Sequence, residues 1–130
     1  MNKYTYLIQI WIMINYCLAL PLLPGRIELA KKFAEENGGH NKEHNEFYKT
    51  AGISGENVWI QRSPPGSGVP DLELVSLETN DPFKTLKEFA TSNHPWAVKF
   101  REYAKKAYGI DFAGPPPPLN EMIIDWHQEE

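Results

Sequence analysis

Apolar positions along the chain follow two spacings, one of helices and one of strands, and these predict the element order strand, helix, strand, strand, helix, strand. Both helical regions are expected to be interrupted, the first near Gly38-Gly39 and the second near 93–95. Asp81-Pro82 is typical of a helix start, because Asp caps the first turn and proline fits its first position. The expected elements are a strand over 15–22, helices over about 27–37 and 41–50, strands over 58–61 and 72–79, an interrupted helix from Pro82 to Gly109, and a strand over 122–126.

The amino terminus carries no charge from Tyr4 to Leu23 and is open to several interpretations. We favour an apolar N-terminal extension over 1–13, followed by a single domain over 14–130. A secretory signal over 1–19, a membrane anchor and a true start at Met13 are the alternatives. Polar residues interrupt the run and prolines end it, so no stable membrane insertion is expected. The expected location is cytoplasmic, or exported if the signal operates.

The predicted strands are apolar on both faces, so other parts of the protein must cover each of the two faces of the sheet. Two helices per chain cover only one face of a four-stranded sheet. The other face needs a partner or a buried ligand, which predicts a homodimer whose sheets meet face to face. The residues expected on that second face are part of Tyr16, Leu18, Leu20, Trp59, Leu74 and Trp126.

Several short pieces occur in an order and spacing that resembles a group of short uncharacterised bacterial proteins in the dimeric α/β-barrel superfamily. This resemblance covers residues 15–127 and implies an α+β, ferredoxin-like βαββαβ fold with a four-stranded antiparallel sheet. The superfamily includes cofactor-free monooxygenases, haem-degrading enzymes, polyketide cyclases and dismutases. The matching pieces are Leu23-Pro24-Gly25-Arg26, Gly52-Ile53, Val58-Trp59-Ile60-Gln61, Asp81-Pro82, Pro95-Trp96, Gly109-Ile110-Asp111 and Asp125-Trp126.

The amino-acid composition argues against several classes of function. Among the 130 residues, 17 acids against 13 lysines and arginines give a net charge of −4 without a basic stripe, which argues against nucleic-acid binding. The single cysteine, Cys17, excludes an intramolecular disulfide and a cysteine-based zinc cluster. We expect no cofactor.

The segment from His40 to His44 matches the H-x-x-E-H pattern of inverted zinc peptidases. On one helix, histidines four apart face the same way and can share a zinc ion. This motif follows Gly38-Gly39 in polar surroundings, so we interpret it as a solvated helix start and predict no metal site. A weaker ligand or substrate role for His44 is the alternative.

The candidate site combines aromatic walls with a few polar groups, which is the usual composition of a small-molecule pocket. We expect the aromatic side chains to enclose a ligand, Gln61 to donate a hydrogen bond, and Glu78, Asp125 or a histidine to transfer a proton. His94 is the first choice among the histidines, because it sits at the helix break. The predicted catalytic residues are His94 and Glu78, and the predicted ligand-binding residues are Trp59, Gln61, Trp96, Tyr103 and Trp126.

These patterns lead to two hypotheses for function. The first is a small-molecule-binding protein that acts as a cofactor-independent monooxygenase or isomerase on a small aromatic ligand. The alternative is a non-catalytic dimeric interaction or regulatory module whose aromatic residues form the core. An open pocket of a few hundred Å³ would favour the first, and a filled interior would favour the second. For Trp96, packing against the sheet is favoured over a lid across the pocket mouth.

Overall fold

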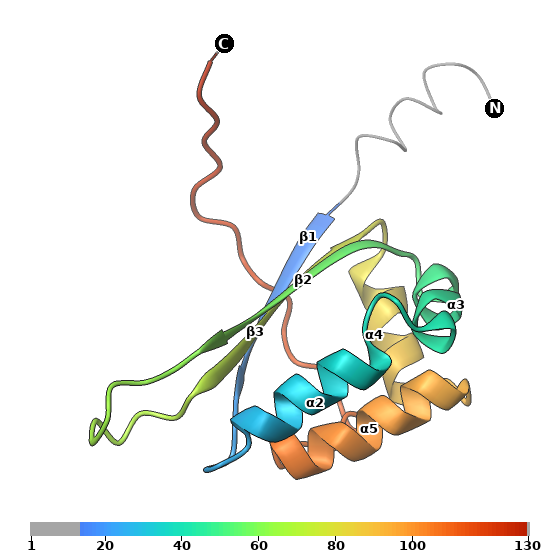
Figure 1. Ribbon diagram of the computed structural model, residues 1–130. Coiled ribbons are helices and arrows are strands. Elements are labelled where there is room, and N and C mark those ends of the chain that lie inside the picture. Colours follow the sequence, from blue (N-terminus) through green and yellow to red (C-terminus); the bar gives the residue numbers. More distant parts are fainter. Residues whose placement is uncertain (1–13, 130) are drawn as a thin grey trace, which may run out of the picture.

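The computed structural model describes residues 14–129, and these form an α+β domain of three strands and four helices (Figure 1). The alternatives that concern residues 1–13 lie outside the described residues. The elements are β1 (Ile14–Pro21), α2 (Ile27–Asn37), α3 (Lys42–Thr50), β2 (Ile53–Gln61), β3 (Leu72–Thr79), α4 (Pro82–Thr91) and α5 (Pro95–Ala107).

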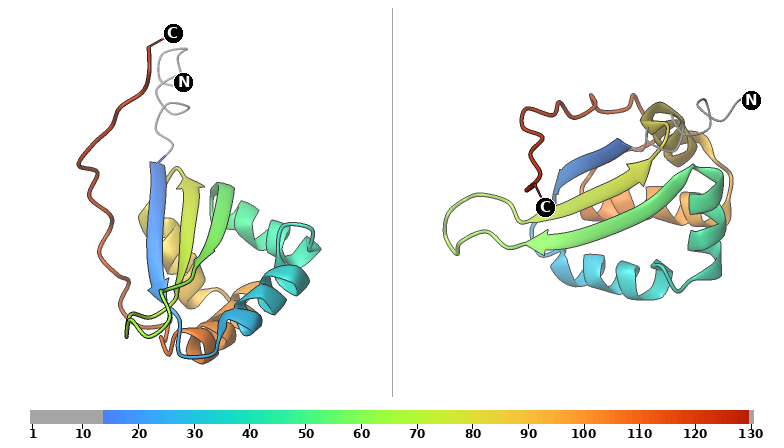
Figure 2. Two further views of the ribbon diagram at one scale, coloured as in Figure 1. Left: turned by 60° about the vertical axis from the view of Figure 1, so that its left-hand side comes forward. Right: turned by 90° about the horizontal axis from the view of Figure 1, so that it is seen from above.

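The three strands form one antiparallel sheet in the order β1-β3-β2. The central strand β3 pairs along its whole length with β1, from Pro21 opposite Leu72 to Ile14 opposite Thr79, and with β2 on its other side. All four helices lie against one face of this sheet, and the loop between β2 and β3 extends beyond the helical layer (Figure 2). The domain therefore has two layers, with one face of the sheet left uncovered by any described helix.

The helix boundaries follow from capping side chains. The Asn41 side chain accepts hydrogen bonds from the backbone N–H groups of Glu43 and His44, and Asp81 accepts one from Lys84 ahead of Pro82. Both caps satisfy donors that the first turn leaves free. The second helical region breaks as expected, and its new start is capped by His94, whose Nδ1 accepts a hydrogen bond from the N–H of Trp96 at 3.1 Å.

The predicted fourth strand is wrong, because the described residues after α5 form no strand. Met122, Ile123, Ile124 and Trp126 are all exposed, each by at least 68%. The segment passes β1, where the Asn120 side chain accepts a hydrogen bond from the Cys17 backbone N–H, and it does not join the sheet (Figure 2). A run of strand-forming residues becomes a strand only where a neighbour pairs with it, and the four prolines before it offer no donors.

The expected division of residues between the two sheet faces is also corrected. Tyr16 and Leu20 are buried against the helices, and Leu18 packs beside them. The uncovered face instead carries smaller or more polar side chains of β1, together with Leu74 and Trp59. Because side chains alternate along a strand, Tyr16, Leu18 and Leu20 must share one face, and the helices cover that face.

The core consists of two hydrophobic clusters between the sheet and the helices. One joins β1 to α2 and α5, and the other joins α3, α4, the start of α5 and Leu77 of β3. Phe33, Val75 and Phe100 are half-buried and touch both clusters. The space between the clusters is where the cavity described below lies.

Among the described residues, no helix is both long enough and apolar enough to cross a bilayer.

Candidate functional site

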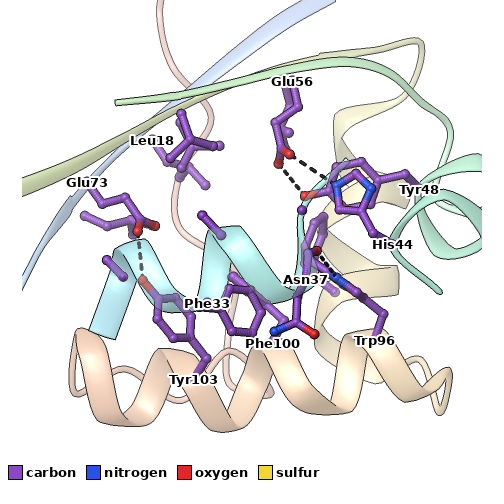
Figure 3. Close-up of a pocket in the computed structure, with 18 of the residues that line it drawn as sticks. Leu18, Phe33, Asn37, His44, Tyr48, Glu56, Glu73, Trp96, Phe100 and Tyr103 are labelled. Atoms are coloured by element: carbon purple, nitrogen blue, oxygen red, sulfur yellow. Dashed lines mark hydrogen bonds and ion pairs between the residues drawn. The ribbon is translucent and has the colours of Figure 1, made fainter. Parts of the chain in front are cut away.

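A cavity of about 100 Å³ lies between the sheet and the helical layer (Figure 3). Its walls are mainly apolar and aromatic, with side chains from β1, β2, β3 and the helices around them. Val58 on the edge strand β2 lines it and is 45% exposed, so solvent reaches the cavity beside this strand. The aromatic side chains that line the cavity are Phe33, Tyr48, Phe89, Trp96, Phe100, Tyr103 and Phe112.

At one end of the cavity, His44, Tyr48 and Glu56 form a hydrogen-bonded cluster (Figure 3). The Nε2 atom of His44 lies 3.3 Å from one carboxylate oxygen of Glu56, and the Tyr48 hydroxyl donates to the other oxygen. The His44 and Tyr48 rings lie 3.8 Å apart between centroids. Two donors thus hold one carboxylate in a fixed orientation at the wall of an apolar space.

The hydrogen-bond partners of His44 determine its protonation. Its Nδ1 atom lies 2.8 Å from the side-chain oxygen of Asn45. The amide nitrogen of Asn45 donates a hydrogen bond to the Gly39 carbonyl, so the oxygen of this amide is the atom that faces His44. Both ring nitrogens of His44 therefore face acceptors, and the ring can satisfy both only as an imidazolium. Burial lowers the pKa of His44, but its hydrogen bonds to Glu56 and Asn45 and the charge of Glu56 outweigh this, so the pKa is raised. When His44 is protonated, it forms an ion pair with Glu56.

A β-bulge at Ser54 turns Glu56 toward the interior. Ile53 lies opposite Thr79 and Gly55 lies opposite Glu78, so Ser54 is an extra residue in β2. Ile53 and Glu56 are three apart and would point to opposite faces of a regular strand. The bulge puts both on the helix-covered face, where Glu56 lies opposite the buried Leu77. Bulges often redirect side chains beside functional sites.

The same cluster also borders an open cleft on the molecular surface, with a volume of about 450 Å³. His44, Tyr48 and Glu56 line both the cleft and the cavity. The other residues that line the cleft come from the segment before α3, from α3 and from the start of β2, and they include the polar side chains of Asn45, Lys49 and Ser54. The ion pair is consequently placed at the boundary between an aqueous and an apolar space.

A second carboxyl group lies at the other end of the cavity (Figure 3). Glu73 of β3 is only 7% exposed, and the Tyr103 and Tyr108 hydroxyls each donate to one of its oxygens, the first at 2.8 Å. Burial raises the pKa of Glu73, the hydrogen bonds from Tyr108 and Tyr103 oppose this, and the charge of Glu56 adds to it, so the net pKa is above the ordinary value.

This raised pKa predicts how Glu73→Gln changes the pH dependence of stability. A carboxyl that holds its proton more tightly when folded weakens the folded state as pH rises from its unfolded pKa, about 4.3, through its folded pKa. The wild type should therefore lose free energy of unfolding relative to Glu73→Gln over that interval. Urea unfolding of both proteins between about pH 4 and pH 8 measures the difference. A difference that is constant, or that moves in favour of the wild type, would contradict the prediction.

Two of the seven predicted site residues lie together at the cavity. Trp96 is 3% exposed and its indole N–H donates to the Asn37 carbonyl at 2.8 Å. The Tyr103 ring stacks on Phe33, with centroids 4.2 Å apart. Both residues line the cavity, so the aromatic-wall part of the predicted site has a structural counterpart.

The other five predicted site residues lie elsewhere. Trp59, Gln61 and Glu78 are exposed strand residues whose positions in the register place them on the uncovered face, and Trp126 is exposed in the C-terminal segment. Glu78 accepts a hydrogen bond from the Ser54 hydroxyl. His94 caps α5, and its Nε2 lies 3.5 Å from Glu46. None of these five lines the cavity.

The H-x-x-E-H segment does not form a shared ligand pair. His40 is exposed and precedes α3, whereas His44 lies within it, so the two histidines are not one helical turn apart. In residues 14–129, no group of three or more His, Cys, Asp or Glu side chains is placed to hold a metal ion.

Sequence reasoning missed Tyr48, Glu56 and Glu73, and it considered His44 only as a weaker alternative. Glu73 carried one available signal, because it is an acid among the apolar residues Leu72, Leu74 and Val75 of the predicted strand. Its spacing from Val75 and Leu77 places it on the same face as these apolar residues. Glu56 lay outside the predicted strand and gave no comparable signal.

Comparison of the chain with family models, with curated proteins and with solved structures finds no match.

Proposed function

We propose that this protein binds a small, largely apolar molecule in the cavity and transfers a proton to or from it. The observation that carries the proposal is the His44–Glu56 ion pair, with Tyr48, at the wall of a cavity enclosed by aromatic side chains. Apolar pockets with a few convergent polar groups are typical binding sites, and titratable groups with a shifted pKa, such as His44, concentrate at functional sites.

The cavity volume limits the size of the ligand. A volume of about 100 Å³ is below the few hundred Å³ expected for an open pocket. It is of the order that holds a single aromatic ring, since an apolar cavity of about 150 Å³ binds benzene. We therefore propose one ring, or an aliphatic group of similar size, as the bound part of the ligand.

The cluster has the groups that an isomerase needs. Glu56 can accept a proton from a carbon of the ligand, and the His44 imidazolium can return one. Tyr48 fixes the carboxylate through its hydrogen bond. Of the two activities in the first hypothesis, isomerisation needs only this transfer, whereas monooxygenation would also consume dioxygen. The structure thus favours proton transfer as the common first step.

The test combines binding with isotope exchange. A panel of single-ring ketones and phenols is titrated into the protein by NMR, and the binders are then incubated in D₂O. We expect saturable binding and incorporation of deuterium at a carbon of the ligand. Glu56→Gln should still bind and should exchange at least about a hundredfold more slowly, in the range lost with a general base.

Two further variants control this experiment. Ala34→Phe adds a ring at a position of α2 that lines the cavity and should abolish binding, whereas Glu35→Phe changes a neighbouring position that does not line the cavity and should not. If no compound binds to the wild type, the proposed function is wrong. If compounds bind without exchange, proton transfer is wrong and a binding function remains.

A homodimer is proposed from the uncovered face of the sheet. Ala19, Leu74 and Trp59 lie side by side across the three strands on this face, and Trp59 is 54% exposed. The exposed apolar segment over 122–126 adds to the apolar surface outside the core. Exposed apolar patches of this kind usually mark an interface. A dimer with an empty cavity would favour the alternative function, a non-catalytic interaction module.

Light scattering at micromolar concentration tests the dimer. We expect twice the chain mass of 14.9 kDa for the wild type. Leu74→Arg should give a monomer, because it buries a charge in the proposed interface. Phe83→Arg, at a 69% exposed position of α4, should leave the dimer intact. A wild-type protein with the mass of a single chain would contradict the proposal.

A further inference from the structure

Glu73 is a buried acid for which the described residues provide no positive partner. None of the ion pairs among residues 14–129 includes it, and the donors to its two oxygens are the neutral hydroxyls of Tyr103 and Tyr108. Buried carboxylates in proteins are normally paired with a cation, because burial otherwise makes their charge costly. Glu73 lines the cavity, so the cavity is the space in which a cation can pair with its carboxylate.

Acidic side chains outnumber basic ones around the cavity. Glu56 and Glu73 line it, and no lysine or arginine does. His44, the single cationic side chain in the lining, is paired with Glu56 at the opposite end from Glu73 (Figure 3). An anionic ligand would therefore meet two acids, whereas a cation would find one carboxylate whose charge is not yet compensated.

The aromatic walls of the cavity also favour a positively charged ligand. Phe33 stacks on Tyr103 beside Glu73, and Phe100 and Trp96 continue the wall toward the other end of the cavity (Figure 3). The faces of aromatic rings are electronegative and attract cations, more strongly where water is excluded. Tyr103 and Tyr108 donate their single protons to Glu73, which leaves the carboxylate free to accept further hydrogen bonds on its remaining lone pairs.

We propose that the cavity binds a small amine in its ammonium form, with the nitrogen at Glu73 and the apolar body along Phe33 and Phe100. This inference rests on the proposed function, because it assigns a ligand class to the same cavity. The ammonium group donates hydrogen bonds to Glu73, and its body has the size of one aromatic ring. The geometry of two tyrosines around one carboxylate orients Glu73 for that contact.

The test compares three compounds of nearly the same shape and different charge, namely benzylamine, benzyl alcohol and benzoate, by isothermal titration at neutral pH with the full chain. We expect benzylamine to bind at least about tenfold more tightly than benzyl alcohol, and benzoate not to bind. Glu73→Gln should remove the preference of amine over alcohol. Glu78→Gln, which changes an acid that does not line the cavity, should preserve it.

The outcomes separate this inference from the proposed function. If benzyl alcohol or benzoate binds as tightly as benzylamine, the ammonium assignment is wrong while binding in the cavity stands. If none of the three binds and the ketone and phenol panel also fails, both are wrong. Circular dichroism first establishes whether Glu73→Gln folds. If it does not, the binding of the three compounds to the wild type decides the ammonium assignment.

Discussion

Replacing Trp96 by alanine is expected to lower the free energy of unfolding by about 3–5 kcal/mol, the usual loss for a buried tryptophan. Trp96 is 3% exposed and lies between the rings of Phe47 and Phe100, whose centroids are 5.4 and 5.5 Å away. The substitution also leaves the Asn37 carbonyl without its indole donor. A domain of this size has about 5–15 kcal/mol in total, so the substitution should remove a large share of the stability. Urea denaturation measures the loss.

Two comparisons make the Trp96 result specific. Trp96→Phe keeps an aromatic ring between Phe47 and Phe100 and should lose clearly less than Trp96→Ala. Phe83→Ala removes a ring that is 69% exposed and should change the free energy of unfolding by less than about 1 kcal/mol. A loss below about 1 kcal/mol for Trp96→Ala would contradict the core assignment and return Trp96 to the role of a lid.

Removing the Glu56 carboxylate with Glu56→Ala is expected to cost about 3 kcal/mol, at the low end of the range for breaking a buried ion pair. The low end applies because the Glu56 side chain is 23% exposed, whereas that of His44 is 8% exposed. The substitution leaves a buried imidazolium unpaired and the Tyr48 hydroxyl without its acceptor. Glu56→Gln retains one acceptor and should lose less.

The loss in free energy of unfolding caused by Glu56→Ala should become smaller as the pH rises. In the wild type the raised pKa of His44 gives stability that is complete below its unfolded pKa of about 6.5 and is lost as pH rises through the folded pKa. In the variant, burial still lowers the pKa of His44 and only the hydrogen bond to Asn45 opposes it, so the stabilisation that Glu56 gives at low pH is lost. Urea unfolding should show a larger difference near about pH 5.5 than near about pH 8.5. An equal or reversed difference would show that His44 and Glu56 are not coupled.

The elements that sequence patterns predicted well are those with strong local signals. The strand over 72–79 and the helix start at Asp81-Pro82 agree with β3 and α4, because apolar spacing and capping residues act locally. The segment over 122–126 has the composition of a strand, yet it is exposed and unpaired. Strand formation depends on a partner that local sequence does not specify.

The candidate site was harder to predict because it depends on which way side chains point. The direction of Glu56 is set by the extra residue at Ser54, and a bulge leaves no clear signal in apolar spacing. Aromatic residues were selected by type, so buried Trp96 and exposed Trp59 were treated alike. His44 was considered with His40, its neighbour in sequence, whereas its partner in the structure is Glu56 of another element.

For the proposed proton transfer, the position of His44, Tyr48 and Glu56 between the inner cavity and the outer cleft has a consequence for repeated turnover. A base buried wholly beside its substrate keeps the abstracted proton until product leaves. Here one side of the ion pair borders the cleft, so the proton can pass to bulk water while the ligand stays bound. In the proposed reaction, the return of these groups to their starting protonation would thereby be uncoupled from product release, and buffer in the medium, rather than opening of the cavity, would set how fast the site recovers.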